Sequence, residues 1–320
     1  MHVRRIIIFI ILATMQVFLP ISIISVVSGK VSINFVVHYI DVGQGDCTFI
    51  EFDDNTCMLI DCGEKSQSIN NKIVSYIKNT GKTQIDYFVL THPNTDHVGN
   101  AIGIANALSI KQVYIPDIAK PENFYTYSNI LEVFSQKDIK VEKFSVGKVV
   151  KNEPFVAFLS PKPSGEEGSS FDELNLSDFP TEKQINNLSP ITYVEYKGAR
   201  FLFTGDADQS QEQIVVNSYN IGLYDILYGK GRVKLKNIDF LKVGHHGGND
   251  SSGQNFLDLI KAKNVVISVG GGNIYNHPDT LVLNRIFQAN QNVNFYRTDM
   301  EGNIKVVVNN RGKYEVFTEL

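Results

Sequence analysis

Apolar and polar positions divide most of the chain into short strand-like runs that alternate with helix-like stretches. Wider spacing of apolar positions predicts helices near Ser66–Asn79, His97–Leu108 and Gln209–Ser218. Short runs rich in β-branched and aromatic residues predict strands. These runs are Asn34–Ile40, Cys47–Phe52, Cys57–Asp61, Asp86–Leu90, Gln112–Ile115, Phe155–Leu159, Ile191–Tyr196, Arg200–Phe203, Phe240–Val243, Val265–Val269, Val293–Phe295 and Ile304–Val308. Two β-rich halves with helices between them predict an α/β protein, a four-layer αββα sandwich.

One segment breaks this pattern. Residues 161–189 are polar and acidic and rich in Ser, Gly and Pro, which predicts a long surface loop near the middle of the fold. No other stretch has the composition of a linker, so we expect residues 31–320 to form one domain.

The three cysteines, Cys47, Cys57 and Cys62, lie close together on a predicted β-hairpin that turns at Asp53–Asn55. If the first residue of that turn pairs with Thr56, Cys47 lies opposite Cys62, and an oxidising compartment would permit a disulfide. The alternative, which we favour, is three buried free thiols, because Cys packs well in strand cores.

The first thirty residues have the pattern of an export element. Arg4 and Arg5 precede the apolar run Ile6–Leu19, and Val26–Ser28 resembles a signal-peptidase site. An uncleaved anchor is the alternative, because Ile6–Val27 is long enough to span a bilayer of about 30 Å. In both cases the positive charges stay inside, so we expect the remaining chain outside the cytoplasmic membrane or attached to its outer face.

Composition and charge limit the class of protein. With 43% hydrophobic and 20% charged residues, the chain is globular, which excludes wholesale disorder, a collagen and a coiled-coil rod. The net charge is −4, and beyond residue 30 there are 27 basic against 34 acidic side chains, a net charge of −7. The net charge of the chain therefore does not indicate a nucleic-acid-binding protein.

One local strip is basic. Lys230, Arg232, Lys234 and Lys236 alternate with other residues, so in an extended segment all four would lie on one side. Because this strip runs into the strand before His245, we expect it to approach the site and bind a polyanion such as DNA. The alternative is an edge strand whose lysines prevent edge pairing.

The candidate catalytic and metal-binding residues follow the ends of predicted strands. The run from His92 to His97 follows an apolar strand, and its imidazoles and Asp96 are ligand types that suit zinc. Thr204-Gly205-Asp206 closes a later strand, His245-His246-Gly247 closes another, and His277 follows a third through a Gly-rich loop. Because strand ends meet at one edge of a layered α/β fold, we expect these groups to converge on a metal site.

Together these motifs resemble the signatures of a metallo-β-lactamase-fold hydrolase. The stretches that carry the resemblance are Asp41–Asp46, Leu59–Gly63, Thr91–Gly99, Phe203–Ala207 and Lys242–Gly247. The Asp-Val-Gly-Gln-Gly-Asp opening, with His-His-Gly and a later His-Pro, resembles the ComEC-type branch, which includes the nuclease-like domain of DNA-uptake channels.

The resemblance implies a site for one or two divalent metal ions, zinc or manganese. His92 and Asn94 would hold the first ion, Asp96 and His97 the second, and Asp206 would bridge both. The family usually has His or Asp at position 94, and its middle histidine is replaced here by the Asn187–Ser189 stretch. Both departures imply a weak first position, because an amide oxygen is a neutral ligand.

Other residues surround this implied site. One of His245 and His246 should be a ligand while the other faces the rim, because adjacent strand-end residues point opposite ways. Asp41, Asp61, Asn187 and Ser189 are candidates for orienting the ligands by hydrogen bonds. His277 is a candidate proton donor, and Asp96 would orient the attacking water as well as bind metal.

The expected function is therefore an exported phosphodiesterase that cleaves DNA or a related polyanion with a metal-activated hydroxide. A metal-poor binding module of the same fold is the alternative from another class, because of Asn94 and the missing histidine. A cell-wall phosphoester or lactone hydrolase is the alternative among enzymes. The oligomeric state stays open.

Overall fold

The computed structural model describes residues 26–27, 30–31, 35–177 and 179–320, and it divides into two units, Met1–Ile33 and Asn34–Leu320. In the first unit, β1 (Val26–Val27) and β2 (Lys30–Val31) pair antiparallel. The rest of the leader predicted over residues 1–30 lies outside the described residues. Among the described helices, none is both long and apolar enough to cross a bilayer.

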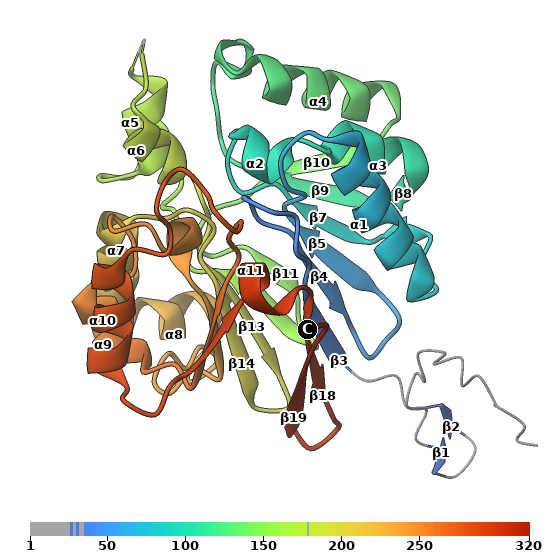
Figure 1. Cartoon of the computed structure of the whole chain (residues 1–320). Coiled ribbons are helices and arrows are strands. Elements are labelled where there is room, and N and C mark those ends of the chain that lie inside the picture. Colours follow the sequence, from blue (N-terminus) through green and yellow to red (C-terminus); the bar gives the residue numbers. More distant parts are fainter. Residues whose placement is uncertain (1–25, 28–29, 32–34, 178) are drawn as a thin grey trace, which may run out of the picture. The chain divides into compact units, whose positions relative to one another are not determined.

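The second unit is built on two mixed sheets whose inner faces pack together (Figure 1). The eight strands of the first sheet, in spatial order, are β10 (Lys140–Lys143), β9 (Gln112–Ile115), β7 (Tyr87–Val89), β5 (Cys57–Ile60), β4 (Thr48–Glu51), β3 (Phe35–Tyr39), β18 (Ile304–Val308) and β19 (Tyr314–Thr318). The seven strands of the second are β11 (Val149–Lys151), β12 (Phe155–Phe158), β13 (Thr192–Tyr196), β14 (Ala199–Phe203), β15 (Phe240–Lys242), β16 (Asn264–Ile267) and β17 (Asn294–Arg297). A small parallel pair joins β6 (Gln84–Ile85) to β8 (Ser109–Ile110).

Helices cover the outer face of each sheet, which confirms the predicted αββα sandwich (Figure 1). On the first sheet these are α1 (Gln67–Asn79), α2 (Thr95–Val98), α3 (Ala101–Ala107) and α4 (Tyr125–Gln136), which follows the short helix η1 (Pro121–Asn123). On the second they are α7 (Gln209–Asn220), α8 (Leu223–Tyr228), α9 (Gln254–Ile260) and α10 (Thr280–Ala289). Shorter helices are α5 (Ser170–Asn175), α6 (Glu182–Asn186), η2 (Gly244–Gly247) and α11 (Thr298–Glu301).

Alternation of side chains along the strands explains why two apolar layers form. In β14, Phe201 and Phe203 are buried between the sheets, whereas Leu202 packs with the helices on the outer face. Rings from the two sheets meet in the middle layer, where the centroids of Phe35 and Phe201 are 5.7 Å apart. Burial on both faces accounts for the continuous apolar runs that the sequence shows in these strands.

The cysteine hairpin forms, but its register differs from the expected one. Glu51 pairs with Cys57 and Thr48 pairs with Ile60, one residue away from the pairing that would set Cys47 opposite Cys62. The three-residue turn starts at Phe52, whose N–H bonds to the carbonyl of Thr56, and this geometry sets the register. All three cysteines are buried and free.

The segment 161–189 is more ordered than the expected surface loop. It contains α5 and α6, and Phe171, Leu174 and Leu188 are buried. Thr181 caps α6 through a capping box with Gln184. Both short helices stand at the end of the sandwich where α2 lies (Figure 1).

The basic strip does not form a strand and does not approach the strand-end histidines. Its four residues lie in the turn-rich segment before β15, at the amino end of that strand, whereas His245 follows the carboxyl end. Arg232 pairs with Glu153 and lies over the ring of Phe155. The expectation that Lys230, Arg232, Lys234 and Lys236 reach the site is therefore wrong. The basic residues and the histidines lie at opposite ends of β15.

Candidate metal centre

The candidate ligands come from the carboxyl ends of strands in both sheets. His92 follows β7 and leads into α2, Asp206 follows β14, and His246 lies in η2 directly after β15. The His97 Nε2 atom lies 3.2 Å from Asp206 Oδ2, and His92 Nε2 lies 3.8 Å from the same oxygen. The face-to-face packing of the two sheets thus brings together residues that are more than a hundred positions apart.

Four side chains form the tightest group. One ligand atom each from Asp96, His97, Asp206 and His246 lie within 4.8 Å of one another. The Nε2 atom of His246 is 3.2 Å from Asp96 Oδ2 and 3.7 Å from Asp206 Oδ2. Two imidazoles and two carboxylates are a ligand set that suits zinc or manganese.

Unpartnered buried atoms indicate that this group fits a cation. The Nε2 atoms of His92 and His97 and Oδ1 of Asp206 are buried and have no hydrogen-bond partner among the described residues. Leaving such atoms unpaired costs about 1 to 3 kcal/mol each. A divalent ion would satisfy all three atoms, which lie beside Asp96 and His246.

Hydrogen bonds at Nδ1 hold each imidazole so that Nε2 faces the centre. Nδ1 of His97 is 2.8 Å from Asp61 Oδ2, and Nδ1 of His246 is 2.9 Å from the Ser268 carbonyl. Nδ1 of His92 lies 3.1 Å from the hydroxyls of both Thr91 and Ser189. Such partners fix the tautomer and the ring plane of a ligand, so the geometry agrees with the orienting roles expected for Asp61 and Ser189.

Asp46 and Lys242 form a buried ion pair behind the ligands, and sequence reasoning assigned neither of them to the site. The Lys242 ammonium contacts the Asp46 carboxylate and lies 3.3 Å from the Gly205 carbonyl. The other Asp46 oxygen is 3.3 Å from Nδ1 of His246. The signal was present, because both residues lie in the Asp-Val-Gly-Gln-Gly-Asp and Lys-Val-Gly-His-His-Gly stretches, but only the fold pairs them.

The charges of the cluster shift its pKa values in opposite directions. Burial and the neighbouring His97 lower the pKa of His92 to about 3, so its imidazole is neutral and free to bind metal. Burial opposes a charged His246, yet the carboxylates of Asp206 and Asp46 raise its pKa to about 10. Protons and a metal ion therefore compete for the same atoms, and metal affinity falls as the pH decreases.

Both adjacent histidines face the centre, in contrast to the expected alternation. His245 and His246 adopt left-handed conformations, with φ of 46° and 53°, and belong to η2 instead of a strand. Nε2 of the half-buried His245 lies 3.9 Å from Asp206 Oδ2, while its Nδ1 lies 2.7 Å from Asp250 Oδ1. Strand alternation does not apply in this turn, yet only His246 belongs to the tightest group, while the half-buried His245 lies beside it and bonds to Asp250.

Asn94 lies at the cavity but its amide is held elsewhere. Its Nδ2 donates to Glu182 Oε1 of α6 at 2.6 Å. Ser189, from the stretch Asn187–Ser189 that the resemblance set at the family's middle histidine, contacts Nδ1 of His92 through its hydroxyl. His92 and Asp206 are therefore the stronger candidates for the first metal position, and Glu182 is an acidic neighbour that the sequence did not indicate.

Two of the expected orienting residues have other roles. The Asp41 carboxylate accepts from the N–H of Gly43 and pairs with Lys72, within the turn after β3. The side-chain Oδ1 of Asn187 accepts from the N–H of Asp208 at the start of α7, and its Nδ2 donates to Ser210. The expectation that Asp41 and Asn187 orient ligands is not met, because the Asp41 side chain bonds to Gly43 and Lys72 and the Asn187 side chain bonds to the start of α7.

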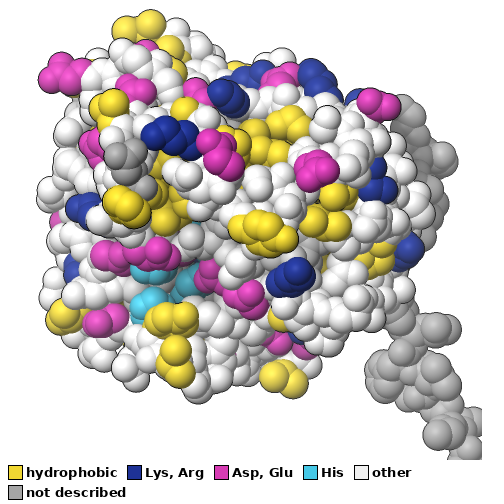
Figure 2. All heavy atoms as spheres, turned by 90° about the horizontal axis from the view of Figure 1, so that it is seen from above, with side chains coloured by type: hydrophobic (Ala, Val, Ile, Leu, Met, Phe, Trp, Pro, Cys, Tyr) yellow, Lys and Arg dark blue, Asp and Glu magenta, His cyan; other side chains and the backbone are white. Residues whose placement is uncertain are grey.

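An open cavity of about 800 Å³ gives access to the centre. Asp96, Asp206, His245 and His246 line it together with His277, whose ring lies 5.4 Å from that of His245. Figure 2 shows the histidines gathered in one place, bordered by acidic and hydrophobic side chains. Burial and His245 lower the pKa of His277, so this ring is neutral near pH 7.

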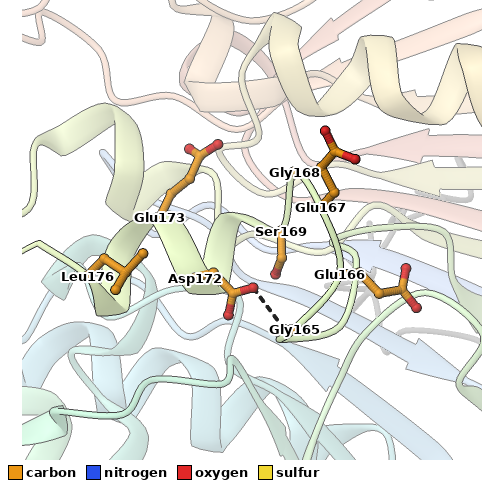
Figure 3. A pocket seen from close by; sticks show the side chains of 8 residues that line it. All are labelled: Gly165, Glu166, Glu167, Gly168, Ser169, Asp172, Glu173 and Leu176. Carbon is orange, nitrogen blue, oxygen red and sulfur yellow. Dashed lines mark hydrogen bonds between the residues drawn. The ribbon is translucent and has the colours of Figure 1, made fainter.

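A second pocket, around α5, is not a comparable site. It is lined by acidic residues, and the carboxylates of Glu166, Glu167 and Glu173 point away from one another (Figure 3). The Asp172 carboxylate instead accepts from the N–H of Gly165 at 2.8 Å. The described residues of this pocket include no histidine, so the candidate chemistry belongs to the larger cavity.

Comparisons with known proteins agree with this geometry. ComE operon protein 3 of Bacillus subtilis (strain 168) is 28% identical over 302 residues, which cover 88% of this chain and 34% of that protein. Competence protein ComA of Neisseria gonorrhoeae is 33% identical over 117 residues, covering 37% of this chain and 15% of that protein. The chain thus spans about a third or less of the length of these relatives.

Solved structures and a family profile extend the comparison. A mutant of CmlA beta-hydroxylase superposes with a TM-score of 0.53 at 10% identity, covering 87% of this chain and 55% of that one, which is a likeness of fold alone. The profile of the metallo-beta-lactamase superfamily matches residues 40–271, a range that contains every ligand of the cluster. The chain therefore belongs to the metallo-beta-lactamase superfamily, and its relatives are ComEC-type competence proteins.

Proposed function

We propose that the protein is an exported, metal-dependent phosphodiesterase that cleaves DNA or a related phosphodiester polymer. The observation that carries the proposal is the set of buried, unpartnered atoms of His92, His97 and Asp206, of which Asp206 lines an open cavity together with Asp96 and His246. The name of one relative, a competence protein, supports a nucleic-acid substrate. No Ser or Cys nucleophile is needed for a phosphodiester.

Asp96, His97, Asp206 and His246 would hold the metal, zinc or manganese. A divalent ion at this place supplies acidification of water and stabilisation of the charge that develops on the phosphate. The Asp96 carboxylate, half-buried at the cavity, can also accept a hydrogen bond from the attacking water. His277 lines the same cavity, and a ring that is neutral near pH 7 can act there as a proton acceptor, whereas the proton-donor role expected for it would require the charged form.

Export rests on the first thirty residues. Arg4 and Arg5 before an apolar run support a signal peptide or an uncleaved anchor. We therefore place the catalytic domain outside the cytoplasmic membrane or at its outer face.

A metal-poor binding module is the second candidate. The contact between Asn94 and Glu182 favours it, because this amide is held by a carboxylate and Ser189 stands where a histidine ligand is usual. Such a module would bind a phosphodiester polymer without cleaving it.

The first prediction separates the two candidates. Protein loaded with manganese or zinc should hydrolyse bis(p-nitrophenyl) phosphate, and Asp206→Ala should lower kcat by at least about a hundredfold, because it removes a carboxylate shared by the whole cluster. Asp258→Ala, which changes an exposed acid on α9, is the control and should keep wild-type turnover. Unchanged turnover in Asp206→Ala would contradict the mechanism, and an inactive wild type with both metals would favour the binding module.

A further inference from the structure

The wall of the cavity has an unusual composition for a site that receives a polyanion. Among the described residues that line it, none is Lys or Arg, and Glu64 and Glu182 add to the negative charge of Asp96 and Asp206. Figure 2 shows acidic and hydrophobic side chains directly around the histidines. Apart from a bound metal ion, this wall therefore offers no cation to pair with phosphates, and phosphate contacts dominate duplex binding in other proteins.

Exposed aromatic side chains line the same cavity. Tyr125, the first residue of α4, is 79% exposed, and Tyr275, in the loop after β16, is 60% exposed. Phe124 lies beside Tyr125 on the same wall. Large rings exposed at the mouth of a site mark a surface that contacts a ligand.

The loop that carries Tyr275 is held in place by hydrogen bonds. The side-chain Oδ1 of Asn273 accepts from the N–H groups of Tyr275 and His277, and its side-chain Nδ2 donates to the carbonyls of Gly270 and His277. The Tyr275 ring stacks on the His277 ring, with centroids 5.7 Å apart and an interplanar angle of 29°. The ring is therefore positioned before a ligand arrives, which reduces the entropy lost on binding.

We propose that this cavity takes single-stranded nucleic acid, with bases stacked on Tyr125 and Tyr275 while a phosphate meets the metal centre; the inference rests on the proposed phosphodiesterase function. A single strand exposes flat base faces, and stacking on aromatic rings is tolerant of sequence. A duplex hides those faces and presents phosphates, for which the wall has acidic groups and no basic partner. Single-stranded DNA or the frayed end of a duplex is therefore the substrate class.

Cleavage by the full chain with Mn²⁺ tests the inference. The substrates are an oligothymidine strand, the same length of abasic strand, and a blunt duplex. We expect the oligothymidine to be cleaved with the highest kcat/KM, and Tyr125→Ala or Tyr275→Ala to lower that value roughly tenfold, toward the value for the abasic strand. Tyr125→Phe and Tyr275→Phe keep the stacking face, so each should lower kcat/KM less than the corresponding Ala variant does. Phe287→Ala removes an exposed ring from α10, outside the cavity, and should retain wild-type activity.

The outcomes distinguish this inference from the function on which it rests. Two results would contradict base stacking while leaving the proposed phosphodiesterase activity intact. In both, bis(p-nitrophenyl) phosphate is hydrolysed, but either the Ala variants cleave oligothymidine like wild type or the duplex is the preferred substrate. If wild type hydrolyses no phosphodiester, the proposed phosphodiesterase activity is wrong. Binding of single-stranded DNA in the cavity is then measured by the fluorescence anisotropy of labelled oligothymidine. Weaker binding by both Ala variants then supports the stacking surface, and equal binding overturns it.

Discussion

At the scale of single residues, we expect Asn94 to limit how many metal ions the centre holds. Its amide nitrogen bonds to Glu182 at 2.6 Å, so a neutral side chain stands where the family usually supplies an imidazole or a carboxylate. The group of Asp96, His97, Asp206 and His246 is complete without it. We therefore expect one well-occupied position and one weak position.

Asn94→Asp should raise the amount of bound metal toward two ions per chain at the same free Mn²⁺ concentration. An anionic oxygen binds a divalent ion more strongly than an amide oxygen does, and a cation between the new carboxylate and Glu182 would relieve their repulsion. The measurement is equilibrium dialysis followed by elemental analysis, with Asn292→Asp, at an exposed position, as the control. Two tightly bound ions per wild-type chain, unchanged by Asn94→Asp, would contradict this expectation.

At the scale of elements, the turn between β3 and β4 supports α2 by direct backbone contact. The N–H of Asp46 donates to the carbonyl of Asp96 at 3.2 Å. Gly45 has a φ of 134°, and a Cβ atom added there would lie 2.3 Å from the same carbonyl oxygen. Only glycine permits this approach, which keeps the Asp96 backbone against the turn.

Gly45→Ala should therefore displace α2, lower the free energy of unfolding by about 2 kcal/mol or more, and weaken metal binding. Gly81→Ala is the matched control, because Gly81 also has a positive φ, of 87°, but has open space around its Cβ position. The control should cost only about 1 kcal/mol and leave metal affinity unchanged. Urea unfolding and metal titration of both variants measure these effects, and equal losses in both would show that the contact with Asp96 is unimportant.

At the scale of the whole molecule, we expect the free energy of unfolding to depend on pH through Glu212, a carboxyl group that has no part in the proposed catalysis. Glu212 of α7 is buried and accepts from the backbone N–H groups of Ser252 and Gly253, at 2.8 and 2.6 Å, in the segment between η2 and α9. Burial raises its pKa to about 8, although these two donors oppose the shift. The folded chain therefore keeps this proton at a pH where the unfolded chain has lost it.

Between the ordinary pKa of 4.5 and about 8, the folded state binds one more proton at Glu212 than the unfolded state does, so its contribution to stability falls as the pH rises. From pH 5 to 8, we expect wild type to lose on the order of 3 kcal/mol relative to Glu212→Gln, which has no proton to release. Urea unfolding in EDTA measures this difference without metal linkage. Glu132→Gln, at an exposed position of α4, should follow wild type, and parallel curves for wild type and Glu212→Gln would contradict the expectation.

The local pattern of apolar residues predicted the secondary structure correctly where a strand is buried in a sheet. β9 and β18 have the bounds that were predicted, because strands buried in a sheet need continuous or alternating apolar residues. The predicted strands Ile191–Tyr196 and Arg200–Phe203 pair as a hairpin that turns at Lys197-Gly198, with φ of 51° and 89° at these positions. The helices α4, α5, α6, α8, α9, α10 and α11 were not predicted, and except for α4 and α10 each has seven residues or fewer, too short for an apolar period to stand out.

The sequence by itself determined the ligand types and their placement near strand ends, because the segments that carry His92, His97, Asp206 and His246 follow apolar runs whose carboxyl ends meet at one end of a layered fold. Only the tertiary structure decided which groups meet. It paired Lys242 with Asp46, brought Glu182 to Asn94, turned both adjacent histidines toward the centre and left the basic strip at the far end of β15. The physical reason is that these contacts depend on turn conformations and on the packing of two sheets, which no local pattern of apolar residues encodes.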